Sequence, residues 1–206
     1  MSGCCDSEYT ADALREKQAG TLKAVLAINA VMFVVIVVAA QLAHSSALFA
    51  DSLDNLGDAM TYALSLMVVA SGIAAKARVA LFKGLLILLA ACVVAAQIGY
   101  KLINPAQPIF ELMGAFSLLA LAANGFCLAL LWRHRHEDIN MSSVWECSRN
   151  DIASNLSVFV AAAAVWLFAS PWPDLMIAAC LVALLLRSSA RVIQGALREL
   201  QPATAN

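Results

Sequence analysis

Long apolar stretches separated by short polar breaks constrain this chain more than any other feature. A helix needs about 20 mostly apolar residues to cross the roughly 30 Å hydrocarbon core of a bilayer. The chain is 62% hydrophobic, against about 45–50% apolar residues in soluble domains. Its apolar stretches cover residues 22–43, 46–73, 79–102, 109–133, 142–170 and 173–197. The sequence therefore predicts an all-α, polytopic membrane protein, a bundle of six transmembrane helices.

The basic residues between these stretches predict the orientation of the bundle. Lys and Arg gather before the first stretch, between the second and third, between the fourth and fifth, and at the end of the sixth, whereas the other loops carry only Lys101. Short cytoplasmic loops carry the excess of Lys and Arg. We therefore expect both termini in the cytoplasm, with a polar segment at residues 1–20, the helical domain at 21–200 and a short tail at 201–206.

Charge and cysteine usage argue against several classes of protein. The 13 Lys and Arg against 14 Asp and Glu give a net charge of −1, so nothing indicates the basic patch of a nucleic-acid-binding protein. The six cysteines lie mostly singly inside apolar stretches, which argues against a disulfide framework. Cys4 and Cys5 fit an inert reduced pair, a palmitoylation site or a soft-metal site. We expect membrane lipid around the bundle and the bacterial inner (plasma) membrane as its location.

Three aspartates lie inside the second apolar stretch, in "ALFADSLDNLGDAM". An aspartate at the bilayer centre costs about 2.5–3.5 kcal/mol on insertion scales. At 100° per residue, Asp54 and Asp58 differ by about 40° around the helix axis, and Asp51 and Asp58 by about 20°. All three are therefore expected on one face, which must point into protein or water rather than lipid.

A second polar group opens the fifth stretch, in "WECSRNDIASN". Cys147 and Asp151 are four residues apart, and Asn155 follows one turn later. Counting residues from the helix ends places this pair and the Asp54–Asp58 pair near the membrane middle. Two facing helices would each present two ligands one turn apart, and four such ligands suit a tetrahedral metal site.

Two explanations without a metal stay open on the residues alone. The aspartates could pair with basic residues to hold helices together, although Arg149 is the only basic residue close by in sequence and cannot neutralise four carboxylates. A relay of protons along the carboxylates is the other, because intramembrane acids also serve proton pathways.

Both polar stretches resemble spans of the cation diffusion facilitator transporters. "SSALFADSLDNLGDAMTYALSLMVV" is similar to the family's second span, which carries Asp-x-x-His-x-x-x-Asp or a similar arrangement. "NMSSVWECSRNDIASNLSVFVAAA" is similar to its fifth span, which carries a His-x-x-x-Asp or Asp-x-x-x-Asp pair. Carried over residue by residue, the family's metal-transport site falls on Asp54, Asp58, Cys147 and Asp151.

The resemblance covers residues 20 to 200. Asn29 and Asn124 stand where the family often has buried asparagine, and "RHRHEDIN" resembles a shortened form of its His-rich loop, in which His134 and His136 are either an entrance site for metal or ordinary solvated residues. The chain resembles a short form without the family's cytoplasmic C-terminal domain. Cys147 stands where His or Asp is usual, which bears on metal preference.

The chemistry of this ligand set predicts the substrate. Carboxylates with a thiolate suit zinc first and cadmium second, and disfavour magnesium and calcium. Metal binding requires deprotonated ligands, whereas an apolar bundle favours the neutral, protonated forms of empty groups. Metal and protons therefore compete, which predicts efflux of a divalent transition metal in exchange for protons, with no prosthetic group. Asp51 either helps to conduct these ions or bonds to a neighbouring helix.

An intramembrane metal-dependent enzyme and a passive cation channel are the alternatives to a transporter. An intramembrane metal-dependent enzyme is disfavoured because the chain has no HExxH sequence, no open ligand position for an activated water and no nucleophile–base arrangement. A passive cation channel would need a water-filled path lined by polar rings. The resemblance implies a homodimer, and the small side chains of Ala161 to Ala164 permit close helix approach.

Overall fold

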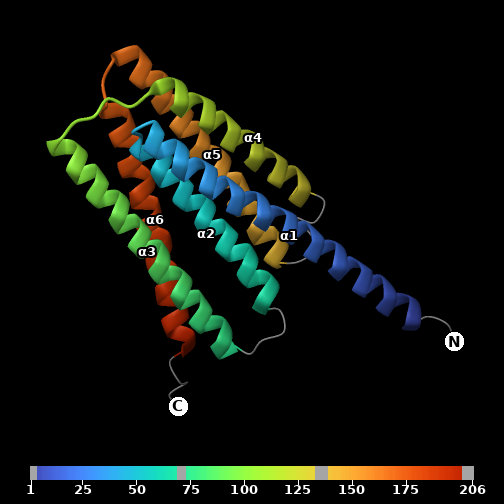
Figure 1. Ribbon diagram of the computed structural model, residues 1–206. Helices are drawn as coiled ribbons and strands as arrows, with labels where there is room; N and C mark the ends of the chain where they lie inside the picture. Colours follow the sequence, from blue (N-terminus) through green and yellow to red (C-terminus); the bar gives the residue numbers. More distant parts are fainter. Residues whose placement is uncertain (1–3, 69–72, 133–138, 201–206) are drawn as a thin grey trace.

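The computed structural model describes residues 4–68, 73–132 and 139–200, which form six helices (Figure 1). They are α1 (Cys4–Leu42), α2 (Ser46–Val68), α3 (Ile73–Ile103), α4 (Phe110–Trp132), α5 (Ile139–Phe168) and α6 (Trp172–Leu200). Within these helices, side chains are not described for residues 4–18, 64–65, 67–68, 73–76, 79 and 139–150. The prediction of an all-α bundle of six helices is confirmed.

The predicted break between the second and third helices was wrong. Residues 74–78, "AAKAR", lie inside α3, which begins at Ile73, while α2 ends at Val68. Alanine, lysine and arginine are all good helix formers, so a basic cluster does not by itself end a helix. The connection falls at residues 69–72, outside the described part of the chain.

Five of the described helices are long and apolar enough to cross a membrane, by length and composition. The exception is α2, which carries Asp51, Asp54 and Asp58. A helix with three acids inside an apolar bundle needs neighbours on several sides, and α2 packs against α1, α3, α5 and α6. The helix that is least suited to lipid is therefore the one most enclosed by protein.

The helices pack as pairs. α1 packs along α2, α4 along α5, and α3 along α6, while α1 also contacts α4 and α2 contacts α5. Four helices thus form one group, and the α3–α6 pair lies beside it against α2 and α5. In Figure 1, α1 begins and α6 ends at the same end of the bundle, as expected for an even number of spans. We call this predicted cytoplasmic end the inner end, and the opposite one the outer end.

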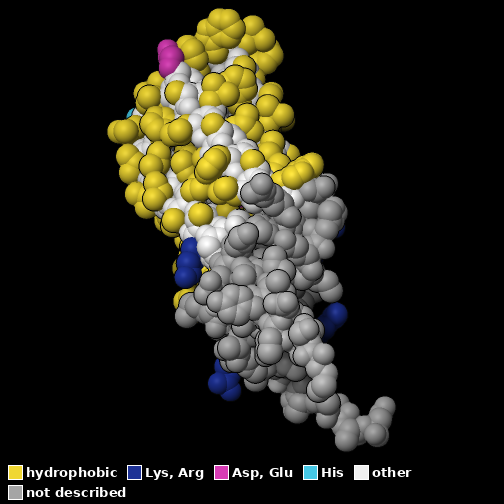
Figure 2. Space-filling view, turned by 90° about the vertical axis from the view of Figure 1, so that its right-hand side faces the viewer, with side chains coloured by type: hydrophobic (Ala, Val, Ile, Leu, Met, Phe, Trp, Pro, Cys, Tyr) yellow, Lys and Arg dark blue, Asp and Glu magenta, His cyan; other side chains and the backbone are white. Residues whose placement is uncertain are grey.

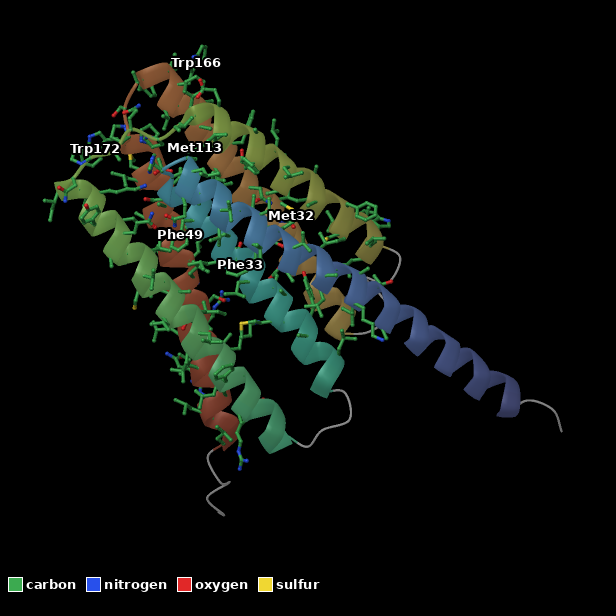
Figure 3. All side chains as sticks on the ribbon, in the orientation of Figure 1. Met32, Phe33, Phe49, Met113, Trp166 and Trp172 are labelled. Carbon is green, nitrogen blue, oxygen red and sulfur yellow. The ribbon has the colours of Figure 1, made fainter. Side chains whose placement is uncertain are left out.

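The outward-facing side chains are largely apolar. On the face shown in Figure 2, hydrophobic side chains cover the outer half, and the Lys and Arg side chains that the view draws lie below this zone. Apolar patches of this extent mark a surface that meets membrane or protein. Trp166 and Trp172 are exposed and both lie at the outer end of the bundle (Figure 3), as expected because tryptophan is enriched at membrane interfaces. Exposed large hydrophobic residues include Val34, Leu89, Phe126, Val160 and Leu184.

Small side chains let the helices approach closely in the interior. Ala161 and Ala162 are buried in the main hydrophobic cluster, and Ala163 is the exposed member of this stretch. Half of the small-residue face proposed from sequence for dimer contact therefore serves packing within the bundle. Met113 is fully buried, as expected of a packing residue.

A buried carboxylate ties α6 to the start of α2 at the outer end. Asp174 is 0% exposed and accepts hydrogen bonds from the Ser45 hydroxyl (2.6 Å), the Ser46 N–H (2.8 Å) and the Ala47 N–H (3.0 Å). The Ser45 hydroxyl in turn accepts the Leu48 N–H at 3.0 Å, which makes Ser45 the N-cap of α2. The first N–H groups of a helix lack partners within the helix, so Asp174 satisfies them from a different helix.

Lys101 strengthens the same corner. Its ammonium group donates to the His44 carbonyl at 2.7 Å, across the turn between α1 and α2. His44 is exposed and has a φ of 49°. Three segments, α3, α6 and the α1–α2 turn, are thereby joined at the outer end.

Candidate metal-transport site

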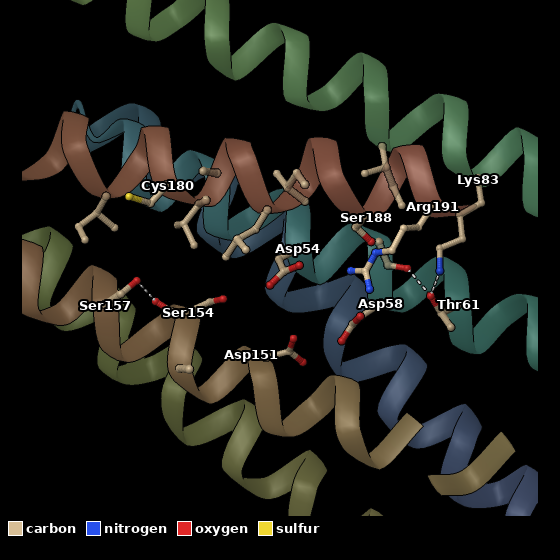
Figure 4. A pocket seen from close by; sticks show the side chains of 18 residues that line it. Asp54, Asp58, Thr61, Lys83, Asp151, Ser154, Ser157, Cys180, Ser188 and Arg191 are labelled. Carbon is tan, nitrogen blue, oxygen red and sulfur yellow. Dashed lines mark hydrogen bonds between the residues drawn. The ribbon is translucent and has the colours of Figure 1, made fainter. Parts of the chain in front are cut away.

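A cavity of about 560 Å³ lies between α2, α3, α5 and α6. It extends from the region of Cys180 and Ser157 on its outer side to Lys83 and Arg191 on its inner side (Figure 4). The four-helix group supplies one wall and the α3–α6 pair supplies the other, so the cavity lies where the two parts of the bundle meet. Its polar lining residues are Asp54, Asp58, Thr61, Lys83, Asp151, Ser154, Ser157, Cys180, Ser188 and Arg191.

Three of the four predicted site residues line this cavity. Asp54 and Asp58 come from α2 and Asp151 from α5, and Figure 4 shows their carboxyl groups directed into the same space. Asp58 and Asp151 are each 8% exposed, and Ser154 lines the cavity with the three aspartates. The Tyr62 hydroxyl donates to Asp58 at 3.2 Å. The four-residue spacing on α2 thus brings two acids into the same cavity as the α5 acid.

The fourth predicted residue, Cys147, lies on α5 one turn before Asp151. Its side chain lies outside the described part of the structure, as do the side chains of Arg149, His134 and His136. Among the side chains that are described, no three from His, Cys, Asp and Glu form a group that could hold a metal ion. The four-ligand site therefore stays a prediction.

Asp51 does not share the cavity with the other two aspartates of α2. It is 2% exposed, and its Oδ2 has no hydrogen-bond partner among the described residues. Asn155 is fully buried, and neither its amide nitrogen nor its amide oxygen has a hydrogen-bond partner among the described residues. Asn29 and Asn124 are buried, as expected, and the Asn29 amide donates to the Val25 carbonyl at 3.0 Å. The polar residues of the bundle thus divide into a cavity set and an interior set.

Sequence reasoning missed several polar groups of the cavity. Lys83 falls inside the third apolar stretch of the sequence, yet its side chain lines the cavity beside Thr61. Arg191 and Cys180, both on α6, line it as well. A lysine inside an apolar span is itself a functional signal, so Lys83 could have been found, whereas the sequence gives no indication of which face of α6 meets α2.

Cys92, Cys127 and Cys180, the cysteines whose side chains are described, are free thiols.

A comparison with family profiles identifies the chain. The profile described as the cation efflux transmembrane domain matches residues 22–201. The chain belongs to the cation efflux family. No individually curated protein matches it. Family members are transporters rather than enzymes, so this cation efflux protein is a multi-pass membrane transporter of divalent metal cations, as the resemblance to cation diffusion facilitators predicted.

Proposed function

We propose that this cation efflux protein exports zinc, and with lower preference cadmium, from the cytoplasm in exchange for protons. The observation that carries the proposal is the meeting of Asp54, Asp58 and Asp151 in one cavity between two parts of the bundle. Buried acids in a membrane span are costly and mark ion pathways. An acid-lined cavity at a boundary between helix groups is the place where a divalent ion would be held in transit.

The ligand types favour zinc and cadmium within the divalent metals. In addition to the three carboxyl groups, we propose the thiol of Cys147 as the fourth ligand; Cys147 lies one turn before Asp151 on α5. Four ligands of this kind suit tetrahedral zinc, and a thiolate favours soft or borderline ions over magnesium and calcium. The bound ion is the transported substrate, not a resident cofactor.

The gathering of Asp54, Asp58 and Asp151 in one cavity supports exchange against protons. Carboxylates that share a low-dielectric site repel one another, so the empty site favours a proton on at least one of them. A divalent metal needs deprotonated ligands and therefore displaces that proton when it binds. Loading of metal and release of protons would then be one coupled event at the same groups.

We further propose that the transporter works as a homodimer in the bacterial inner membrane, with its inner end at the cytoplasm. The apolar faces of several helices are available for contact with a second copy, although Ala161 and Ala162 are already used within the bundle. Light scattering of the detergent-solubilised protein, corrected for micelle mass, should give twice the 21.8 kDa chain mass. A mass of one chain would contradict the dimer.

Zinc uptake into proteoliposomes tests the transport proposal. Wild-type protein should move zinc when a pH difference is imposed and should slow when an ionophore collapses it. Asp58→Asn and Asp151→Asn, which remove charge but little volume, should each lower uptake by more than about tenfold, because even groups that only support metal ligands matter by 10–100-fold. Glu111→Gln, an exposed acid on α4, is the matched control.

The same assay separates the proposal from its alternatives. Uptake that ignores the imposed pH difference would favour a passive channel. Wild-type uptake by both Asp58→Asn and Asp151→Asn would overturn the assignment of the site.

A further inference from the structure

We propose that Lys83 is a tethered counter-cation of the transport cavity, whose ammonium group competes with the metal for the aspartates and so promotes metal release. This inference rests on the proposed function, because it assumes that the metal binds at Asp54, Asp58 and Asp151. It adds a residue from α3, a helix that contributes no predicted ligand.

The position of Lys83 is the first observation behind the proposal. Lys83 and Lys101 are the only charged residues between positions 80 and 103 of an otherwise apolar span. A lysine near a helix end usually extends its ammonium group towards the nearest membrane interface. The side chain of Lys83 is instead half-buried and lines the cavity (Figure 4).

The contacts of its ammonium group are the second observation. The Nζ of Lys83 donates to the hydroxyl of Thr61, which lies on α2 three residues after Asp58. Asp58 lines the same cavity as Lys83. A positive charge from α3 is therefore held against the acidic face of α2.

Arg191 adds a second positive charge on the same side. It lines the cavity from α6, and Figure 4 shows its guanidinium group directed towards the region of Asp58. Both basic groups thus stand on the inner side of the acids, along the direction in which a cytoplasmic metal would arrive. Lys83 differs from Arg191 in being half-buried, whereas Arg191 is exposed.

The physical reason for such a group follows from what a transporter must do. Several carboxylates and a thiolate in a low-dielectric bundle would hold a divalent ion tightly, and a positive charge a few ångströms away weakens that binding. When the metal leaves, any carboxylate that has not yet taken up a proton would be left unpaired in the membrane, which is unfavourable. A tethered ammonium group offsets both effects, because it repels the bound ion and partly neutralises the empty cavity.

Equilibrium zinc binding to the detergent-solubilised protein tests this role. Lys83→Met and Lys83→Gln should each lower the Kd for zinc by about tenfold or more, the effect of removing one partly screened charge. Both should also slow turnover at saturating zinc, because release becomes limiting. Lys83→Arg should keep the weaker affinity of wild type. Lys23→Met, an exposed lysine of α1, is the control for removing a positive charge elsewhere.

A purely structural role for Lys83 predicts something different. If Lys83 only ties α3 to α2, then Thr61→Val, which removes the hydrogen bond and keeps the charge, should change the Kd as much as Lys83→Met does. The counter-cation role predicts a much smaller change for Thr61→Val. Equal shifts, or a Kd that is unchanged or higher in both neutral Lys83 variants, would overturn the inference.

Asp58→Asn and Asp151→Asn in the same titration distinguish this inference from the proposed function. If both variants bind zinc like wild type, the metal site itself is misplaced, and the role of Lys83 fails with it. If both lose zinc binding while Lys83→Met and Lys83→Gln bind like wild type, the site stands and only the counter-cation role is refuted.

Discussion

Replacing Asp174 with alanine is expected to destabilise the bundle by about 3–5 kcal/mol, because it removes the acceptor of three buried hydrogen bonds. The carboxylate binds the Ser45 hydroxyl and the N–H groups of Ser46 and Ala47, at 2.6 to 3.0 Å. None of these residues is exposed, so water does not readily replace the carboxylate. Asp174→Ala therefore leaves the start of α2 unsatisfied and detached from α6.

The magnitude follows from the individual bonds. A hydrogen bond to a charged group contributes about 1.5–3 kcal/mol, and a buried donor left without a partner costs about 1–3 kcal/mol. The three bonds share one carboxylate, so their contributions do not add fully. The Ser45 hydroxyl also keeps its role as acceptor for the Leu48 N–H, at 3.0 Å. The expected loss of stability is therefore smaller than the sum of the three separate hydrogen-bond contributions.

Thermal unfolding of the detergent-solubilised protein is the assay. Asp174→Ala should lower the melting temperature by about 6 °C or more, taking 2–4 °C per kcal/mol for a chain of this size. Asp174→Asn keeps one acceptor oxygen and should lower it less. Glu111→Ala is the matched control, because Glu111 is an exposed acid in the first turn of α4. A melting temperature of Asp174→Ala equal to wild type would refute the reasoning.

Two further predictions concern helix packing and metal selectivity. Gly84→Ala should destabilise the protein by about 1–3 kcal/mol through overpacking, because the added Cβ would lie 2.6 Å from the Ile193 Cγ1. Gly99→Ala is the control, since its Cβ would meet nothing within 4 Å, and it should be neutral or stabilising in the same melting assay. A stable Gly84→Ala variant would show that α3 and α6 can separate there at little cost. Cys147→Asp should reduce uptake of cadmium relative to zinc, since oxygen ligands favour harder ions, and an unchanged ratio in parallel uptake assays would contradict a thiolate ligand.

The fold could be predicted largely from the apolar stretches, because a helix that crosses a bilayer must satisfy its own backbone and bury no polar loops in lipid. The break at residues 74–78 could not, because charge marks a membrane boundary without ending a helix. The buried role of Asp174 was also hidden. In sequence it stands in "SPWPD", a boundary segment, and its partners around Ser45 lie more than 120 residues away.

The candidate site likewise contains residues that the sequence could predict and residues that it could not. Asp54, Asp58 and Asp151 could be found because a four-residue spacing puts two side chains on one helix face whatever surrounds it. Asp51 was expected on the same face, yet it is buried away from the cavity, because small angular differences decide which neighbour a helical side chain meets. The contribution of Lys83 depends on how α3 packs against α2, which no local pattern reveals.

We propose that Asp54, Asp58, Cys147 and Asp151 bind the transported metal together. X-ray absorption at the zinc edge of the loaded protein would show these ligands directly. We expect one sulfur at about 2.3 Å and oxygen ligands at about 2.0–2.2 Å, with the sulfur signal lost in Cys147→Asp and retained in Cys180→Ser. A zinc site without sulfur, or a sulfur signal that survives Cys147→Asp, would contradict the assignment.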